Sequence, residues 1–275
     1  MSHTIQDSPL GQSSAYISSY TPALLFPIAR AQSRVHLNLT DTALPFYGND
    51  LWTGYELSWL DRGGKPQVAI AEFSIPANSP NIIESKSFKL YLNSFNQTVC
   101  ESWKQVIELL TRDLSEAAGA EVGVSLFSLE AFSEKALQML QGSLLDAQEL
   151  TVSHYHPEPA LLTTTATPVA DEQVYSHLLK TNCPVTGQPD WASIQIQYSG
   201  QTIDPAGLLA YIISFREHQD FHEHCVERIF CDILERCKPQ SLTVYARYTR
   251  RGGLDINPFR STEAVAALSL RLVRQ

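Results

Sequence analysis

Two neighbouring segments in the first half of the chain alternate between apolar and polar residues. The apolar residues are Tyr55, Leu57 and Trp59 in residues 54–60, and Val68, Ile70 and Ile75 in residues 67–75. Alternation with a period of two is typical of half-buried strands. The segment Asp61–Lys65, which reads DRGGK, carries the glycines of a tight turn. The pattern therefore predicts a β-hairpin over residues 54–75, whereas residues 1–45, with scattered Ser, Thr and Pro, are expected to be irregular.

The next two segments predict a strand and a helix. Residues 86–92 alternate, with Phe88, Leu90 and Leu92 on one side, and this pattern predicts a third strand. Apolar residues then recur at spacings of three and four, which indicates an amphipathic helix that ends at Gly119. These residues are Trp103, Val106, Ile107, Leu110 and Leu114.

The second half of the chain repeats the layout of the first at an offset of 120 residues. Tyr91, Ser94 and Phe95 match Tyr211, Ser214 and Phe215; Val106, Leu109 and Leu114 match Val226, Ile229 and Leu234. One interpretation is two related modules in tandem; the other is a chance alignment of two helices with similar apolar spacing. The Thr- and Pro-rich residues 152–172 predict the join. We thus expect an α+β fold with modules at 1–151 and 173–275, each an antiparallel sheet with helices packed on one face.

Composition narrows the class of protein. The chain has 275 residues, 44% of them hydrophobic and 18% charged, which favours a packed core over disorder. A net charge of −9 argues against broad, non-specific binding to nucleic acid or to anionic lipid.

Several features predict a cytoplasmic protein. The odd number of cysteines, five, without framework spacing, indicates a reducing compartment. The polar start MSHTIQDSPLGQSS lacks the charged and apolar regions of a signal peptide. No apolar run approaches the roughly 20 residues that a membrane span needs.

The most informative pair of polar residues is Cys183 and Asp190. The segment between them contains Pro184, Gly187 and Pro189, which prevent a continuous helix or strand there. The alternation of Ile194, Ile196 and Tyr198 then predicts a strand. A thiolate is a nucleophile and a carboxyl moves protons, so the pair suggests covalent chemistry on an electrophilic carbon. The alternative is that Cys183 is a small buried hydrophobe, as most single cysteines are.

Charged residues gather in a second segment, residues 83–95. Glu84, Lys86 and Lys89 stand where the predicted third strand begins. A solvated strand edge protected by lysines is the interpretation that the residues alone favour. The other interpretation is a ligand site, in which a carboxylate accepts N–H groups beside a cation that binds phosphate.

Histidines and cysteines gather in a third segment, residues 216–237. His222, Glu223 and His224 precede a predicted helix whose apolar stripe includes Val226 and Ile229. His218 lies four residues before His222, and three cysteines follow at intervals of six: Cys225, Cys231 and Cys237. This composition invites a zinc interpretation, but no tight Cys-x-x-Cys or His-Glu-x-x-His pattern is present. We therefore predict no metal site.

A basic, glycine-rich turn forms the fourth segment. Arg250, Arg251, Gly252 and Gly253 follow a predicted strand over residues 244–248. Glycine lets the backbone approach a ligand, and arginine binds phosphate in a bidentate manner; a basic turn that closes a hairpin is the alternative. The sequence contains neither the G-x-G-x-x-G motif nor a P-loop.

Five segments together resemble the 7-cyano-7-deazaguanine reductases of queuosine biosynthesis in their long, two-module form. They are FYGNDLWTGYELSWL, IESKSFKLYLNSFNQT, HLLKTNCPVTGQPDW, FHEHCVERIF and YARYTRRGGLDINPFR, and the ESKSFK string is the signature of that family. The resemblance implies two tandem tunnelling-fold (T-fold) modules. It implies reduction of the nitrile of 7-cyano-7-deazaguanine to a primary amine, with NADPH as the reductant.

The resemblance also implies roles for individual residues. Catalytic roles fall on Cys183 as the nucleophile that gives a covalent thioimide, on Asp190 as the proton donor and on His222 beside the reacting group. The positions that match substrate contacts are Ile83, Glu84, Ser85, His222 and Glu223. The positions that match NADPH contacts are Ser85, Lys86, Arg251 and Gly252. His224, Cys225, Cys231 and Cys237 are expected to be structural.

Partners and competing functions complete the expectations. The family's fold implies a homodimer that binds a small-molecule substrate and neither nucleic acid nor membrane. Three other functions stay open on the residues alone: a Cys-dependent amidohydrolase, a zinc-dependent enzyme of the cyclohydrolase kind, and a non-catalytic binder of a purine-like or pterin-like base.

Overall fold

The computed structural model describes residues 16–40 and 43–275, so the predicted absence of a signal peptide falls on residues outside the described part. Two compact units divide the chain. Unit 1 comprises Met1–Asp41, Asp50–Ala136 and Arg250–Ile256, and unit 2 comprises Thr42–Asn49, Leu137–Thr249 and Asn257–Gln275. The predicted division at 152–172 stays a prediction, and strand β7 already begins within that segment, at Thr164.

Unit 1 is built on the hairpin of β2 (Tyr47–Leu60) and β3 (Pro66–Pro76), and β5 (Gly123–Phe127) pairs antiparallel with β3. The predicted turn is present, because the Asp61 amide donates to the Lys65 carbonyl at 3.0 Å. The prediction for the apolar face of β3 was wrong in part, since Val68 is exposed. The buried residues of β3 are Ala69, Ala71, Phe73 and Ile75.

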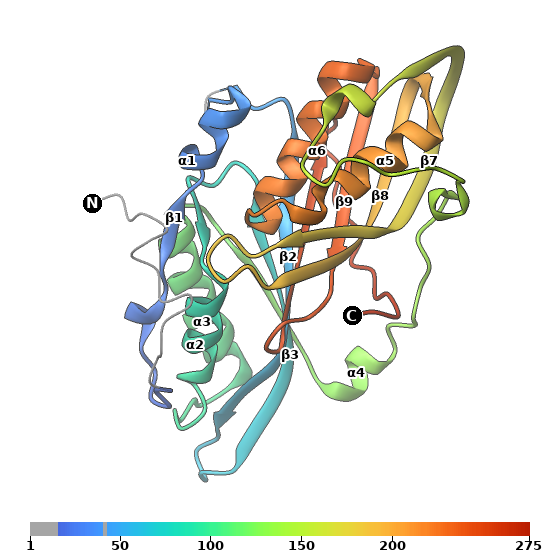
Figure 1. Cartoon of the computed structure of the whole chain (residues 1–275). Coiled ribbons are helices and arrows are strands. Elements are labelled where there is room, and N and C mark those ends of the chain that lie inside the picture. Colours follow the sequence, from blue (N-terminus) through green and yellow to red (C-terminus); the bar gives the residue numbers. More distant parts are fainter. Residues whose placement is uncertain (1–15, 41–42) are drawn as a thin grey trace. The chain divides into compact units, whose positions relative to one another are not determined.

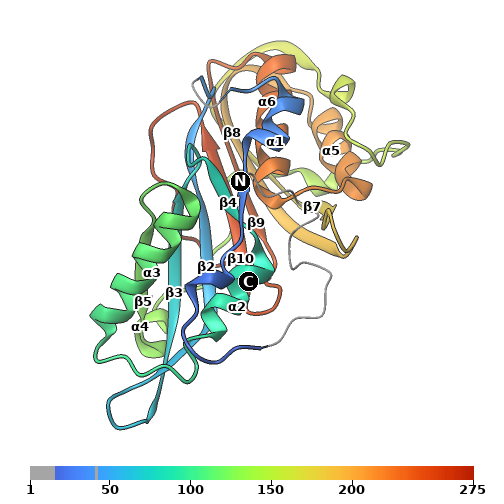
Figure 2. The ribbon, with the colours of Figure 1, turned by 90° about the vertical axis from the view of Figure 1, so that its left-hand side faces the viewer.

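Two helices cover one face of this sheet: α2 (Ser85–Asn93) and α3 (Trp103–Ala118). Figure 1 shows them next to each other, and Figure 2 shows α3 along β3 and β5. Helix α3 confirms the prediction from spacing, with Val106, Leu110 and Leu114 in the core. Gly119 ends it in the left-handed conformation, at φ +71°. A short helix, α4 (Leu129–Ser133), follows β5.

The predicted strand over residues 86–92 was wrong, because this segment is helix α2. Glu84 caps the helix through its side chain, which accepts from the amides of Lys86 and Ser87 at 2.6 and 2.8 Å. Phe88 packs between Trp52 and Phe73, with ring centroids 5.1 and 4.9 Å away. The cap and this aromatic packing override the local alternation.

The expectation that residues 1–45 are irregular was also wrong for part of the described segment. Elements η2 (Pro22–Leu24), β1 (Pro27–Ala29), α1 (Ala31–Arg34) and η3 (Val35–Leu37) lie there. Strand β1 pairs antiparallel with β4 (Asn81–Ile83), which leads into α2. Next to β1, the buried Arg30 forms an ion pair with the buried Asp50 at 2.5 Å.

Unit 2 contains sheet strands in the order β10-β9-β8-β7-β6. The long hairpin is β7 (Thr164–Asn182) with β8 (Pro189–Ile203), and β9 (Ser241–Tyr248) and β10 (Leu254–Ser261) extend it antiparallel. The short β6 (Ser143–Leu144) pairs parallel with β7, so this sheet is mixed. Strand β10 begins in unit 1 and β2 begins in unit 2.

The predicted alternation after Asp190 is confirmed, since Ile194, Ile196 and Tyr198 are all buried. Helices α5 (Pro205–Ser214) and α6 (His222–Cys237) lie next to each other (Figure 1). Short 3-10 turns complete the unit: η4 (Leu145–Ala147), η5 (Pro159–Leu161) and η6 (Phe215–Glu217). The fold of both units is thus of the α+β type.

The repeat predicted from the sequence has an atomic counterpart. In each unit a serine near the end of the first helix donates to the carbonyl three residues earlier, Ser94 to Tyr91 and Ser214 to Tyr211, both at 2.6 Å. The second helix has 16 residues in both units. The match is therefore a helix–loop–helix in each module and not a strand end followed by a helix.

Candidate active site

Cys183 and Asp190 lie at the closed end of the β7–β8 hairpin. The Cα atoms of Asn182 and Pro189 are paired, and Cys183 and Asp190 each follow one member of this pair. The Cys183 amide donates to the Gln188 carbonyl at 2.9 Å, and the Gly187 amide donates back to the Cys183 carbonyl at 3.0 Å. Both side chains are buried. The structure confirms the predicted turn, with Cys183 directly before it and Asp190 at the start of β8.

The segment before α6 fixes this end of the hairpin. The Asn182 amide donates to the His218 carbonyl at 2.8 Å, and the Asp220 amide donates to the Asn182 carbonyl at 3.2 Å. Lys180 adds a bond from its ammonium to the Arg216 carbonyl at 2.6 Å. The backbone just before Cys183 is therefore held on both sides, by β8 and by residues 218–220.

His222 lies against Asp190 and Tyr248. Its Nε2 is 3.4 Å from Oδ2 of Asp190, and both side chains are largely buried. The His222 ring stacks on the Tyr248 ring, with centroids 3.7 Å apart and planes at 1°. Glu223, the next residue in the first turn of α6, is also buried. The structure thus places a thiol, a carboxyl and an imidazole on three neighbouring elements of unit 2.

His224, Cys225 and Cys237 are buried in α6, whereas Cys231 is partly exposed. His224 Nδ1 lies 3.1 Å from Oδ1 of Asp220. Burial, followed by the charges of Asp220 and Asp190, raises the pKa of the Cys225 thiol well above its usual value. Burial raises the pKa of Cys237 to about 11. Thiols with raised pKa values are poor nucleophiles, because the thiolate is the reactive form.

The zinc interpretation can be compared with the positions of the histidines. Among residues 16–40 and 43–275, no group of three or more His, Cys, Asp or Glu side chains is arranged to hold a metal ion. Burial lowers the pKa of His218, which favours its neutral form. His222 and His224 instead lie against the carboxylates of Asp190 and Asp220.

Glu84 heads a group of candidate residues in unit 1. Its carboxylate is fully buried at the N-terminus of α2, where the Lys86 and Ser87 amides bond to it. Burial raises the pKa of Glu84, and the two amides partly offset this rise. Ile83 before it is buried, whereas Ser85 and Lys86 after it are partly exposed. The earlier strand-edge interpretation was therefore wrong about the backbone, and Glu84 is a helix cap.

The basic turn Arg250–Gly253 joins β9 to β10 and lies in unit 1. Gly252 and Gly253 have φ angles of +59° and +77°, which glycine adopts without strain. A Cβ atom at Gly252 would lie 2.5 Å from Nζ of Lys89. The Arg250 guanidinium stacks over the Tyr55 ring at 4.2 Å. The backbone of the turn thus lies close to the cationic side chain of Lys89, and Arg251 is partly exposed.

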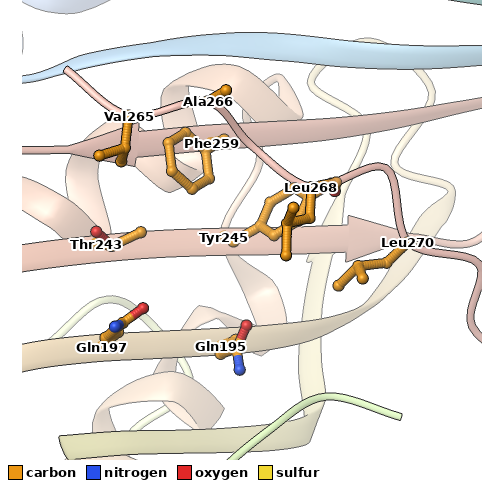
Figure 3. A pocket seen from close by; sticks show the side chains of 9 residues that line it. All are labelled: Gln195, Gln197, Thr243, Tyr245, Phe259, Val265, Ala266, Leu268 and Leu270. Carbon is orange, nitrogen blue, oxygen red and sulfur yellow. The ribbon is translucent and has the colours of Figure 1, made fainter. Parts of the chain in front are cut away.

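A pocket of about 170 Å³ lies on one face of strands β8, β9 and β10 in unit 2 (Figure 3). Strands β8, β9 and β10 form its floor, and the C-terminal segment crosses over it. The lining residues are Gln195, Gln197, Thr243, Tyr245, Phe259, Val265, Ala266, Leu268 and Leu270. Its polar groups bond within the protein: Gln195 to the Gln141 carbonyl, and Tyr245 to the Leu268 carbonyl. The candidate catalytic residues do not line it.

Comparison with known proteins identifies the family. The family described as "Nitrile reductase, 7-cyano-7-deazaguanine-reductase N-term" matches residues 16–126, and the family described as "QueF-like protein" matches residues 189–267. The chain belongs to the 7-cyano-7-deazaguanine reductase family. The resemblance inferred from its five segments is confirmed.

Two curated relatives of this family extend over nearly the whole chain. A protein of Bordetella avium (strain 197N) is 59% identical over 272 residues, which cover 98% of this chain and 99% of the relative. A protein of Bordetella pertussis (strain Tohama I) is 55% identical over 273 residues, which cover 99% and 100%. Both are named NADPH-dependent 7-cyano-7-deazaguanine reductase.

Sequence reasoning did not predict that Tyr248 lies beside the candidate site, in contact with His222. A signal was present, because Leu242, Val244, Ala246 and Tyr248 alternate along β9 and all are buried. The alternation predicts that Tyr248 faces inward, but nothing in it predicts a stack on His222.

Over the residues that the structure describes, no helix is both long and apolar enough to span a membrane.

Proposed function

We propose that this protein reduces the nitrile of 7-cyano-7-deazaguanine to the primary amine 7-aminomethyl-7-deazaguanine, with NADPH, in queuosine biosynthesis. Two relatives that match nearly the full chain and carry this activity in their names are the main support. The hairpin end that holds Cys183 and Asp190, with His222 3.4 Å from Asp190, supplies the chemical groups that such a reduction needs. The mechanism rests on this placement of the thiol, the carboxyl and the imidazole.

The first step is addition of Cys183 to the substrate. Sγ of the Cys183 thiolate forms a bond to the nitrile carbon, and the nitrile nitrogen takes a proton from Asp190, which gives a neutral thioimide. The C=N bond of the thioimide accepts hydride more readily than the nitrile does. After the first hydride and a proton have been added, the C–S bond breaks, Cys183 leaves as a thiolate, and a protonated imine remains. A second hydride then gives the amine.

Buried carboxylates suit the recognition of the base. The deazaguanine edge carries N–H groups, and an ionised carboxylate accepts two of them at once. We assign this role to Glu84 and Glu223, with Ile83 and Ser85 as further substrate contacts. His222 is assigned to the reacting group, because it lies against Asp190. The backbone amides that bond to Glu84 orient its carboxylate.

Residues of unit 1 fit a phosphate-bearing reductant. NADPH supplies the hydrides when it is bound. We assign contacts with it to Ser85, Lys86, Arg251 and Gly252. Lysine and arginine offer the charges that phosphates require. At Gly252 the left-handed backbone and the absence of a Cβ atom permit a close approach.

The same proposal extends to the tunnelling fold, assembly and location. Each unit has antiparallel sheet strands and two main helices, as we expect of a T-fold module, and we expect two copies of the chain to form a homodimer. All five cysteines are free, which fits a reducing cytoplasm. No nucleic acid partner is expected. Light scattering of the purified protein tests the dimer, and a monomer at micromolar concentration would contradict it.

Mass spectrometry tests the proposed chemistry. The protein mixed with 7-cyano-7-deazaguanine, without NADPH, should gain the mass of one substrate. Cys183→Ala should abolish the adduct, whereas the matched change Cys237→Ala, at the C-terminal end of α6, should retain it. Addition of NADPH should then give the amine, with NADPH consumed. An acid product without NADPH consumption would instead favour the Cys-dependent amidohydrolase.

A further inference from the structure

Tyr248 stands in an unusual relation to the proposed catalytic histidine. It is the last residue of β9 and is fully buried. Its ring lies face to face with the His222 imidazole, with centroids 3.7 Å apart and planes at 1°. Most aromatic neighbours in proteins are offset or tilted. A parallel contact at this distance confines the imidazole to one plane.

Hydrogen bonds alone do not fix the His222 ring. Its Nε2 is 3.4 Å from Oδ2 of Asp190, which is longer than an ordinary hydrogen bond. Its Nδ1 is buried and has no hydrogen-bond partner among the described residues. An imidazole with one long polar contact is free to tilt about its χ2 bond. The stack on Tyr248 is the contact that opposes this tilt.

Tyr248 is itself held firmly against the strand that carries Asp190. Its Cα atom is paired with that of Ala192, two residues after Asp190 in β8. The next residue, Thr249, donates from its amide to the Trp191 carbonyl at 2.8 Å. Because Asp190 lies in β8 and Tyr248 pairs with β8, this strand pairing fixes the position of the Tyr248 ring relative to Asp190.

The ring of Tyr248, and not its hydroxyl, makes the contact. Within the described residues the hydroxyl has no hydrogen bond of ordinary geometry, although Thr181 is close enough to lower its pKa. Burial raises the pKa of Tyr248 well above its usual value, and the charges of Cys225 and Asp190 add to this rise. The interaction with Thr181 partly offsets it. The phenol is therefore neutral, and phenylalanine offers the same face to His222.

We propose that Tyr248 is a positioning residue that holds the His222 imidazole in the plane in which its Nε2 faces Asp190. This inference rests on the proposed function and deepens it. Thioimide formation requires the Asp190 proton to reach the nitrile nitrogen as the Cys183 sulfur adds to carbon. A tilted imidazole would alter the environment of that proton, so Tyr248 acts on the rate of adduct formation through His222.

The test compares Tyr248→Phe, which keeps the stack, with Tyr248→Leu and Tyr248→Met, which remove it. The rate of adduct formation is measured at saturating 7-cyano-7-deazaguanine without NADPH, together with the substrate Kd and the thermal unfolding midpoint. Tyr248→Phe should retain most of the rate. A folded Leu or Met variant should lose about tenfold or more, since small misplacements of catalytic groups are costly, with Kd nearly unchanged.

A double-mutant cycle separates positioning from a general structural role. In the His222→Ala background, Tyr248→Leu should cause no further loss of rate, because the residue it positions is absent. An equal loss in both backgrounds, or a wild-type rate in the folded Leu or Met variant, would overturn the inference and leave the proposed function intact. If the wild-type protein forms no adduct, the proposed function fails, and this inference fails with it.

Discussion

The hydroxyl of Tyr211 donates a 2.6 Å hydrogen bond to Oδ2 of Asp232, and thereby joins α5 to α6 in unit 2. Unit 1 contains the same bond between α2 and α3, from Tyr91 to Asp113 at 2.7 Å. Unit 1 adds a second donor, Tyr20, to the same oxygen of Asp113 at 2.5 Å. The relationship between the two halves of the chain therefore extends beyond apolar spacing to a buried polar contact.

Loss of either tyrosine hydroxyl should destabilise the protein. Tyr91→Phe and Tyr211→Phe each leave a carboxylate short of a buried donor, and we expect each to lower the free energy of unfolding by about 1–3 kcal/mol. The loss should be smaller for Tyr91→Phe, because Tyr20 still donates to Asp113. Urea denaturation measures both. The exposed Tyr47→Phe is the control, expected to stay within about 0.5 kcal/mol of the wild type.

Asp190→Asn should slow thioimide formation and leave substrate binding in place. Asparagine has nearly the shape of aspartic acid but cannot supply the proton that the nitrile nitrogen takes up. Removal of general acid catalysis typically costs about 100-fold or more in rate. Stopped-flow measurement of adduct formation, alongside equilibrium titration with the substrate, checks this. An unchanged rate of adduct formation would show that the proton comes from another group.

Gly252→Ala should weaken NADPH binding more than a matched glycine change does. Gly252 and Gly64 both have left-handed backbones, at φ +59° and +77°, so alanine costs about 1–2 kcal/mol of stability at either. A Cβ atom at Gly252 meets Lys89, whereas no described atom lies within 4 Å of one at Gly64. KM for NADPH should rise only in Gly252→Ala. Equal KM values in both variants would remove Gly252 from the proposed cofactor contacts.

Glu84 should make the stability of the free protein depend on pH. Burial raises its pKa in the folded state, so the folded protein retains this proton at higher pH than the unfolded chain does. The resulting stabilisation is complete below the ordinary carboxyl pKa of about 4.3 and is lost as pH rises through the raised value. Glu84→Gln does not titrate. Its stability relative to the wild type should therefore increase between about pH 4 and pH 7.

Glu130 provides a control of opposite sign for this pH dependence. Hydrogen bonds from its own backbone amide and from Ser128 lower its pKa in the folded state. Its stabilisation is thus present above the ordinary pKa and lost as pH falls. Glu130→Gln should lose stability relative to the wild type as pH rises towards the ordinary carboxyl pKa of about 4.3, and this difference should change little at higher pH. Urea denaturation at a series of pH values without substrate measures both trends, and trends of the same sign would contradict the explanation.

The sequence was a good guide where one local pattern dominated. Alternation predicted the hairpin of β2 and β3, and spacing predicted α3 with its end at Gly119, because burial of a single apolar face determines each element. It failed over residues 86–92, where alternation pointed to a strand. The Glu84 cap and the packing of Phe88 between Trp52 and Phe73 stabilise a helix there, and both depend on neighbours that a local pattern does not include.

The sequence by itself determined the family, the tandem relationship of the modules and the loop that carries Cys183 and Asp190, because short motifs and proline or glycine positions act locally. Only the tertiary structure decided which groups surround that loop. Tyr248 is 26 residues from His222 in the chain, and their rings meet because β9 pairs with β8 while α6 begins beside them. Such contacts between distant segments follow from packing, which no local pattern encodes.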